Sequence, residues 1–411
     1  MENSLAFARQ LDQEDPLRAF RDRFYLPQRN GEPLIYFCGN SLGLQPKTVQ
    51  QALEHELTIW QQHGVEGWFE GENPWYSIHR RCKEPLAQIL GALPAEVCPM
   101  NNLTVNLHLL LTSFYRPQGQ KTKILTIGGD FPSDQYALES HLKSRGLNPD
   151  EQFIELFPRS GEPTWRTEDL LNAIEHYRDS LALVLMSGLH YYTGQVFDMA
   201  TINQKAHEVG VMVGFDLAHA VGNVPLALHD WGVDFAFWCS YKYLNSGPGG
   251  VAGIFIHEKH HAAGLPRLAG WWGYDEARRF EMTKGFVPMP GADGWQVSTP
   301  TILAMAVHEA ALEITAEAGM PALRRKSEQL TGFLEFVLRD SGYPLTILTP
   351  AERGCQLSLL VPKNGKAVFN QLTEKGIIGD WREPDCIRLA PAPLYNTFEE
   401  VWRVGQVFLS A

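Results

Sequence analysis

Short apolar runs rich in β-branched residues recur along the middle of the chain, with amphipathic stretches between them. These runs are continuously apolar rather than alternating, which is typical of strands covered on both faces, as in a mostly parallel sheet. Helical patterns fit between them, at 133–145 after a possible N-cap at Ser133 and at 168–179 after one at Thr167. This alternation predicts a doubly wound α/β fold. The expected strands are 123–127, 181–186, 211–215, 235–239 and 251–256.

The pattern changes after Thr301. A long helical segment, 304–318 and then 322–340, precedes shorter strand-like pieces at 355–361 and 387–390, which indicates a separate α+β domain. The expected division is an N-terminal arm over 1–50 that packs on the small domain, a large α/β domain over 51–305 and a small C-terminal α+β domain over 306–411.

The net charge and the distribution of apolar residues limit the kinds of molecule that this protein is expected to bind. Lys and Arg number 35 against 47 Asp and Glu, a formal net charge of −12 with no basic run. That balance disfavours nucleic acid and anionic membrane surfaces. No apolar stretch approaches the roughly 18 residues that span a bilayer, so we expect a cytoplasmic protein that binds a small molecule. The six cysteines lie far apart and form no C-x-x-C pair, a spacing that fits reduced thiols better than disulfides. We therefore expect no metal site.

Two charged residues follow apolar strands. Asp216 ends the run VGFD, at the sheet edge where open α/β folds bind ligands, and His219 comes three residues later. Lys242 follows another apolar strand and precedes a glycine-rich turn. Desolvation there would lower the pKa of the Lys242 amine and free it as a nucleophile. Plainer readings remain open, since Asp216 could cap the next helix and Lys242 could extend to water.

Asp216 and Lys242 together fit the two needs of pyridoxal phosphate. One is an amine for the aldehyde, and the other is a carboxylate that keeps the pyridine nitrogen protonated. The phosphate would need donors at a helix N-terminus, and Thr104 lies where such a helix begins, although it could be a plain N-cap. Phe131 follows the strand 123–127 and could stack on a planar cofactor or pack in the core.

These segments together resemble the kynureninase family, within the fold-type I (aspartate aminotransferase-like) pyridoxal-phosphate enzymes. The resemblance covers nearly the whole chain and implies a mostly parallel, seven-stranded type of sheet in the large domain. It implies hydrolysis of the Cβ–Cγ bond of L-kynurenine, or of its 3-hydroxy form, to anthranilate (or 3-hydroxyanthranilate) and L-alanine in tryptophan catabolism. The matching segments include YFCGNSLGLQP, NNLTVNLHLL, FPSDQYALES, SGLHYYTGQV, VGFDLAHAVGN, SYKYLNSGPGG, GWWG and IRLAPAPLYN.

The resemblance also implies a role for each site residue. Lys242 forms the Schiff base, Asp216 faces the pyridine nitrogen, and Tyr241 acts as an acid or base or binds the phosphate. Trp271 and Thr299 reach the phosphate from the neighbouring subunit, which implies a homodimer with shared sites. The substrate-binding residues are Ser41, Trp68 and Arg388, the last as the bidentate partner of the substrate carboxylate. The remaining cofactor-binding residues are Leu103, Thr104, Phe131, Pro132, Ser133, Asp134, Ser187 and His219.

Two other functions are weighed against this one. A cysteine desulfurase would share Asp216, His219 and Lys242, but it needs a reactive cysteine on a mobile glycine-rich loop, and the sequence has none in such a loop. A binding or regulatory protein on the same fold would be expected to have lost Lys242 or Arg388. We therefore expect a hydrolase.

Overall fold

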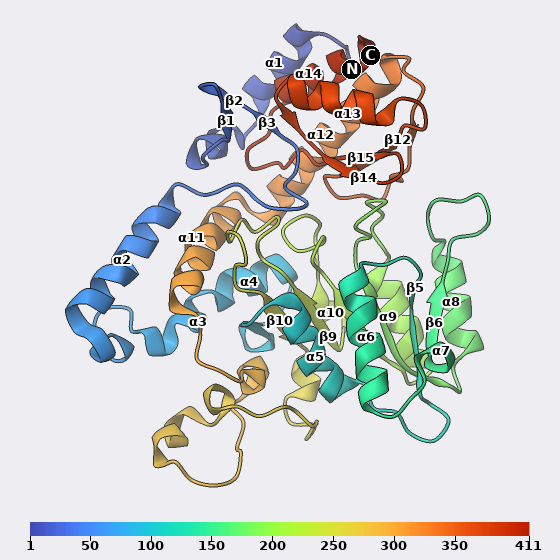
Figure 1. Cartoon of the computed structure of the whole chain (residues 1–411). Coiled ribbons are helices and arrows are strands. Elements are labelled where there is room, and N and C mark those ends of the chain that lie inside the picture. The colour runs from blue at the N-terminus through green and yellow to red at the C-terminus, as the bar shows by residue number, and fades with distance from the viewer. Residues whose placement is uncertain (411) are drawn as a thin grey trace.

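The centre of the protein is a seven-stranded sheet (Figure 1). The computed structural model describes residues 1–410 and gives the strand order β4-β10-β9-β8-β7-β5-β6. The strands from β9 to β6 in this order run parallel, whereas β10 runs antiparallel to both β9 and β4. The expected fold class, a mostly parallel sheet in an α/β protein, is confirmed. The strands are β4 (Val97–Pro99), β5 (Lys123–Ile127), β6 (Phe153–Leu156), β7 (Leu181–Ser187), β8 (Met212–Asp216), β9 (Phe235–Trp238) and β10 (Gly253–Ile256).

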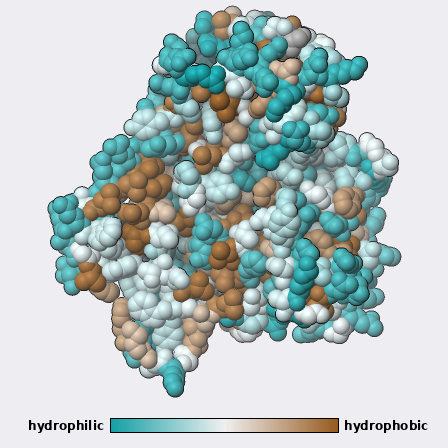
Figure 2. Space-filling model, viewed as in Figure 1, coloured by the Kyte–Doolittle hydropathy of each residue, from teal (hydrophilic) through white to brown (hydrophobic). Residues whose placement is uncertain are grey.

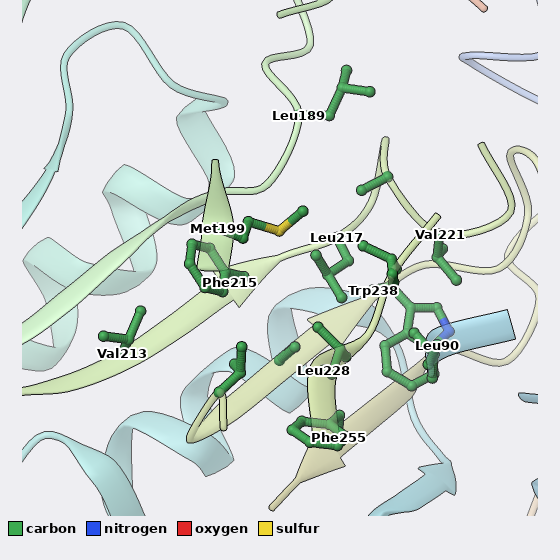
Figure 3. Close-up of a cluster of buried hydrophobic side chains, with 14 of the residues drawn as sticks. Leu90, Leu189, Met199, Val213, Phe215, Leu217, Val221, Leu228, Trp238 and Phe255 are labelled. Atoms are coloured by element: carbon green, nitrogen blue, oxygen red, sulfur yellow. The ribbon is translucent and has the colours of Figure 1, made fainter. Parts of the chain in front are cut away.

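Helices cover both faces of this sheet. Apolar side chains of α5 and α6 bury one face, and those of α4, α8, α9 and α11 bury the other. Figure 3 shows part of the second core, where Met199 and Leu228 lie beside Phe215 and Trp238 of the sheet. The bounds are α2 (Thr48–His63), α3 (Ile78–Arg81), α4 (Lys83–Leu90), α5 (Leu103–Phe114), α6 (Pro132–Ser144), α7 (Pro149–Gln152), α8 (Thr167–His176), α9 (Met199–Glu208), α10 (Leu228–Trp231) and α11 (Ile302–Ala318).

The two predicted helix caps are wrong. Helix α6 begins at Pro132, so Phe131 is its N-cap and Ser133 lies inside the first turn. Proline fits that first position because its fixed φ suits a helix and its missing N–H would have no helical partner there. Helix α8 begins at Thr167 itself, with Arg166 as N-cap, and two acidic side chains in its first turn suit the positive end of the helix.

A second, smaller sheet and three helices form the C-terminal part of the chain. The sheet is antiparallel, in the order β11-β12-β15-β14. Its core lies between the sheet and the helices, with Phe333, Leu357 and Val404 among the buried residues. The elements are α12 (Met320–Asp340), β11 (Thr346–Ile347), β12 (Leu357–Leu360), α13 (Gly365–Glu374), β13 (Ile377–Ile378), β14 (Asp380–Arg382), β15 (Cys386–Leu389) and α14 (Phe398–Leu409).

The N-terminal segment lies against this C-terminal part (Figure 1, blue against red). Helix α1 (Leu5–Glu14) contacts α14, and β3 (Ile35–Tyr36) pairs in parallel with β13, while β1 (Gln28–Arg29) and β2 (Glu32–Pro33) form a separate hairpin. A buried ion pair, Lys326 Nζ to Asp15 Oδ2 at 2.7 Å, holds the C-terminal end of α1 against α12.

The domain division remains a proposal. Helix α11 packs mainly on α2 and α4, whereas α12 packs on α14. We therefore propose that the boundary lies at the α11–α12 junction near Gly319 rather than at residue 305. Within residues 1–410, no helix combines the length and the apolar character that crossing a membrane requires.

Candidate active site

The carboxyl ends of the parallel strands place most of the predicted site residues around one cavity. Ser187 ends β7 and pairs in register with Asp216, which ends β8, and Lys242 lies in the loop after β9. Parallel strands end at the same edge of a sheet, which is why residues so far apart in sequence meet there. The cavity is lined by Leu103, Thr104, Asp130, Phe131, Ser133, Ser187, Leu189, Tyr191, Asp216, Ala218, His219, Tyr241 and Lys242.

Two helix N-termini meet on one wall of the cavity. Thr104 lies in the first turn of α5 and Ser133 in the first turn of α6, and their hydroxyl oxygens are 2.7 Å apart. The first backbone N–H groups of each helix lack helical partners, and within residues 1–410 neither N-cap, Asn102 nor Phe131, supplies a side-chain bond to them. Two helix dipoles and two hydroxyls at one point make a site for an anion such as a phosphate.

Three buried carboxyl groups, those of Asp130, Asp134 and Asp216, lie close together, and Asp130 and Asp216 line the cavity. Asp216 is 6% exposed, and its Oδ1 accepts a hydrogen bond of 2.7 Å from the amide of Ala218. Burial raises the pKa of Asp216, and it raises the pKa of Asp130 to about 6. Burial and the charges of Asp216 and Asp130 raise the pKa of Asp134 well above its usual range. Carboxyl groups crowded in this way favour a bound cation, which is what a protonated pyridine ring beside Asp216 would be.

Lys242 lies beside a histidine that stays neutral. Its Nζ is 2.8 Å from Nε2 of His219, and burial, with a smaller effect of the Lys242 charge, holds the pKa of His219 well below its usual range. The imidazole therefore accepts the hydrogen bond from Nζ. Burial raises the pKa of Tyr241, so its phenol keeps its proton. The site thus offers an amine, an orienting imidazole and a phenolic proton donor.

The four-stranded C-terminal sheet contributes Arg388 from β15. Its guanidinium is buried, donates to the carbonyl of Tyr191 at 2.6 Å and forms an ion pair with Asp380. Ser41 Oγ donates to the same Asp380 Oδ2 at 3.0 Å, so the two predicted substrate residues meet around this carboxylate. The Tyr191 ring lies 5.4 Å from the ring of Phe131, which connects Arg388 with the cavity.

Seven predicted residues do not line the cavity of this chain: Ser41, Trp68, Pro132, Asp134, Trp271, Thr299 and Arg388. Pro132 sets the start of α6. Trp68 packs against Trp272 with ring centroids 5.6 Å apart, in an aromatic cluster that also includes Trp271. Trp271 is 43% exposed, and Thr299 is exposed as well.

Sequence reasoning missed three polar residues of the site: Asp130, Tyr191 and Asp380. Asp130 and Tyr191 each come shortly after a predicted strand, so their position at the carboxyl edge of the sheet was a usable signal. Asp380 had none, because its place opposite Arg388 depends on the register between β14 and β15.

Comparison with known proteins gives consistent relatives over the full length. A model of the kynureninase C-terminal domain matches residues 323–408. The chain is 49% identical to a kynureninase from Flavobacterium psychrophilum, covering 99% of this chain and 97% of that protein. It is 50% identical to one from Myxococcus xanthus, covering 98% and 96%, and 51% identical to one from Xanthomonas campestris pv. campestris, covering 96% and 95%.

Solved structures of the same fold are more distant in sequence. A cysteine desulfurase from Escherichia coli superposes with a TM-score of 0.78 at 18% identity and covers 95% of this chain and 97% of that chain. One from Thermococcus onnurineus gives 0.76 at 17%, covering 92% and 94%. These likenesses establish the fold.

Proposed function

The chain belongs to the kynureninase family, and from this we propose that it hydrolyses the Cβ–Cγ bond of L-kynurenine to anthranilate and L-alanine. One observation in the structure supports the reaction most directly. A lysine amine, a buried carboxylate and two helix N-termini with hydroxyls line the same cavity. This is the set of groups that pyridoxal phosphate needs.

The residues present fit that cofactor. Thr104 and Ser133 would hold its phosphate, Asp216 would keep the proton on its ring nitrogen, and Lys242 would bind its aldehyde carbon. Phe131, 45% exposed at the cavity wall, would cover the ring. When bound, the cofactor withdraws electrons from the substrate's α-carbon and so makes proton removal and carbon–carbon cleavage accessible.

The protein's own groups then bind substrate and move protons. Lys242 is placed to remove the α-proton, with His219 orienting its amine. Tyr241 carries a proton that it can donate during later steps. Arg388 binds the substrate carboxylate as a bidentate donor. To do so, its guanidinium must either keep its ion pair with Asp380 while binding the substrate or give up that pair.

The cysteine desulfurase alternative lacks a suitable nucleophile. Burial raises the pKa of all six thiols, so they stay protonated at neutral pH. A thiol is a much weaker nucleophile than a thiolate. The likeness to solved desulfurases therefore extends to the fold and not to the chemistry.

A product assay tests the proposed reaction. Purified protein loaded with pyridoxal phosphate is incubated with L-kynurenine, and anthranilate and alanine are quantified. We expect equimolar products from the native protein and none from Lys242→Ala at the same concentration. A native protein that binds the cofactor but releases no anthranilate above the Lys242→Ala background would contradict the proposal.

We also propose a homodimer that completes each site across its interface. Aromatic side chains exposed beside Trp271 include Phe69 and Phe280. A second apolar surface lies beside α2 and α11, seen in brown in Figure 2, where Val49, Leu53, Ala304 and Val307 line a groove. Apolar area of this kind is usually covered by a partner.

The six cysteines are free thiols, which supports a cytoplasmic location.

Mixing two inactive variants tests the shared site. One protomer carries Lys242→Ala, and the other carries Trp271→Ala with Thr299→Ala. Each hybrid dimer would hold one intact site, so equal mixing should restore about a quarter of native activity. Persistent inactivity at every mixing ratio, with subunit exchange verified by mass spectrometry, would exclude shared sites.

A further inference from the structure

Three side chains capable of binding a metal converge at the edge of the sheet opposite the active site. Glu96 directly precedes β4, His229 lies in α10 shortly before β9, and His257 directly follows β10. Since β10 runs antiparallel to its neighbours, its end meets the starts of β9 and β4. One ligand atom from each residue lies within 4.8 Å of the other two.

The carboxylate of this cluster is fully buried and held in place. Glu96 is 0% exposed, its Oε1 accepts the amide of Glu258 at 2.8 Å, and its Oε2 accepts the amide of Leu93 at 2.9 Å. Nδ1 of His229 lies 3.0 Å from Oε1. Such hydrogen bonds to a carboxylate are the kind of outer contact that orients a metal ligand.

His257 brings a second imidazole nitrogen close to the same carboxylate. Its Nε2 lies 3.2 Å from the carbonyl oxygen of His229, which can only accept, so Nε2 carries the proton. The other ring nitrogen, Nδ1, accepts a hydrogen bond and therefore carries the lone pair. That lone pair receives the amide of Lys259 at 3.2 Å, yet it also lies 3.6 Å from Oε1 of Glu96. A cation between the two atoms would take the Nδ1 lone pair in place of that hydrogen bond from the Lys259 amide.

We propose that Glu96, His229 and His257 bind one Zn²⁺ ion. A tetrahedral zinc ion with bonds of about 2.0–2.2 Å separates its ligand atoms by about 3.3–3.6 Å. The measured separations from Oε1 of Glu96, 3.0 Å to His229 and 3.6 Å to His257, lie around that range. His229 is 30% exposed at its side chain, so solvent can reach the site and supply a fourth ligand.

A neighbouring cluster provides a matched control. Asp234 is also a buried carboxylate next to two histidines, but the ammonium of Lys259 lies 2.8 Å from its Oδ1 and repels a metal ion. His207 in that cluster has a side chain 34% exposed, close to the value for His229. Replacing His207 therefore removes a histidine of similar exposure and similar partner without touching the proposed site.

Zinc content and stability test the proposal. Holoenzyme stripped with a chelator is incubated with ZnCl₂, passed through gel filtration and analysed for metal. We expect about one zinc per chain in the native protein and in His207→Asn, and less than about a fifth of that in His229→Asn and His257→Asn. Excess zinc should raise the Tm of the native protein by at least about 2 °C and leave the Tm of both site variants unchanged.

X-ray absorption at the zinc edge gives a readout that needs no variant. The expected first shell holds nitrogen and oxygen at about 2.0–2.1 Å with two imidazole rings, and no sulfur. The assignment would be overturned if the native protein retained no zinc or if the first shell contained sulfur. It would also be overturned if the site variants kept the zinc or if His207→Asn lost it. Turnover of L-kynurenine should persist in the site variants, which separates this proposal from that of the active site.

Discussion

Removing the hydroxyl of Thr104 or of Ser133 should weaken the binding of pyridoxal phosphate by an amount that the structure constrains. Each hydroxyl would donate a bond to a charged phosphate, worth about 1.5–3 kcal/mol, but the two hydroxyls already bond each other at 2.7 Å, worth about 0.5–1.5 kcal/mol. The native protein therefore gains two phosphate bonds and loses one mutual bond on binding. A single variant gains one and loses none, so with the middle value of each range the difference is about 1.25 kcal/mol, or about eightfold in Kd.

The double variant distinguishes this account from independent contributions. With both hydroxyls gone, no mutual bond remains to be exchanged, so the loss exceeds the sum of the single losses by the energy of that bond, about 0.5–1.5 kcal/mol. The assay is a spectroscopic titration of the apoprotein with pyridoxal phosphate for Thr104→Val, Ser133→Ala and the pair. Thr112→Val is the control, because its hydroxyl bonds the His108 carbonyl within the same helix. Changes below about twofold in both single variants, or a strictly additive double variant, would refute the reasoning.

Three further predictions concern the lysine that binds the cofactor and the residues that bind the substrate. Borohydride reduction of the holoenzyme followed by peptide mapping should label Lys242, and a label on another lysine would remove it from the proposed role. Arg388→Lys should raise KM for L-kynurenine with little change in cofactor affinity, because a point charge replaces a bidentate donor; unchanged kinetics would exclude Arg388 from the site. Trp68 offers an apolar face and one N–H donor, so kcat/KM should favour L-kynurenine over 3-hydroxykynurenine by about tenfold, and equal values for the two substrates would sink this idea.

Strands buried on both faces were the part of the fold most accessible from sequence. The run Lys123–Ile127 was predicted to the residue, because a short, mostly apolar run rich in β-branched residues is typical of a strand buried on both faces. Strands β4 and β6 were missed since they are short and lie at the two edges of the sheet. The caps were assigned to Ser133 and Thr167 by residue type. The observed caps lie two residues earlier in α6, which begins at Pro132, and one residue earlier in α8, whose first turn is acidic.

The site residues also differ in how far the sequence could predict them. Asp216 and Lys242 follow long apolar strands, so strand order alone brings them to one edge of the sheet. The ion pair between Arg388 and Asp380 arises instead from the register of two short antiparallel strands, and a shift of one residue would turn Asp380 to the other face. Sequence patterns carry little information on register in strands of three or four residues.

Trp271 and Thr299 pose a different problem, since neither pattern nor register within one chain can decide which cavity they serve. A side chain that binds a cofactor held by a neighbouring subunit must lie on the surface of an isolated chain, because its own surroundings form only on assembly. The exposure of both residues is therefore what a shared site requires, and burial of Trp271 in its own core would have argued against it. Trp68 packs against Trp272 in the same aromatic cluster. Any aryl pocket that Trp68 lines is accordingly proposed to be that of the partner, which couples substrate preference to assembly.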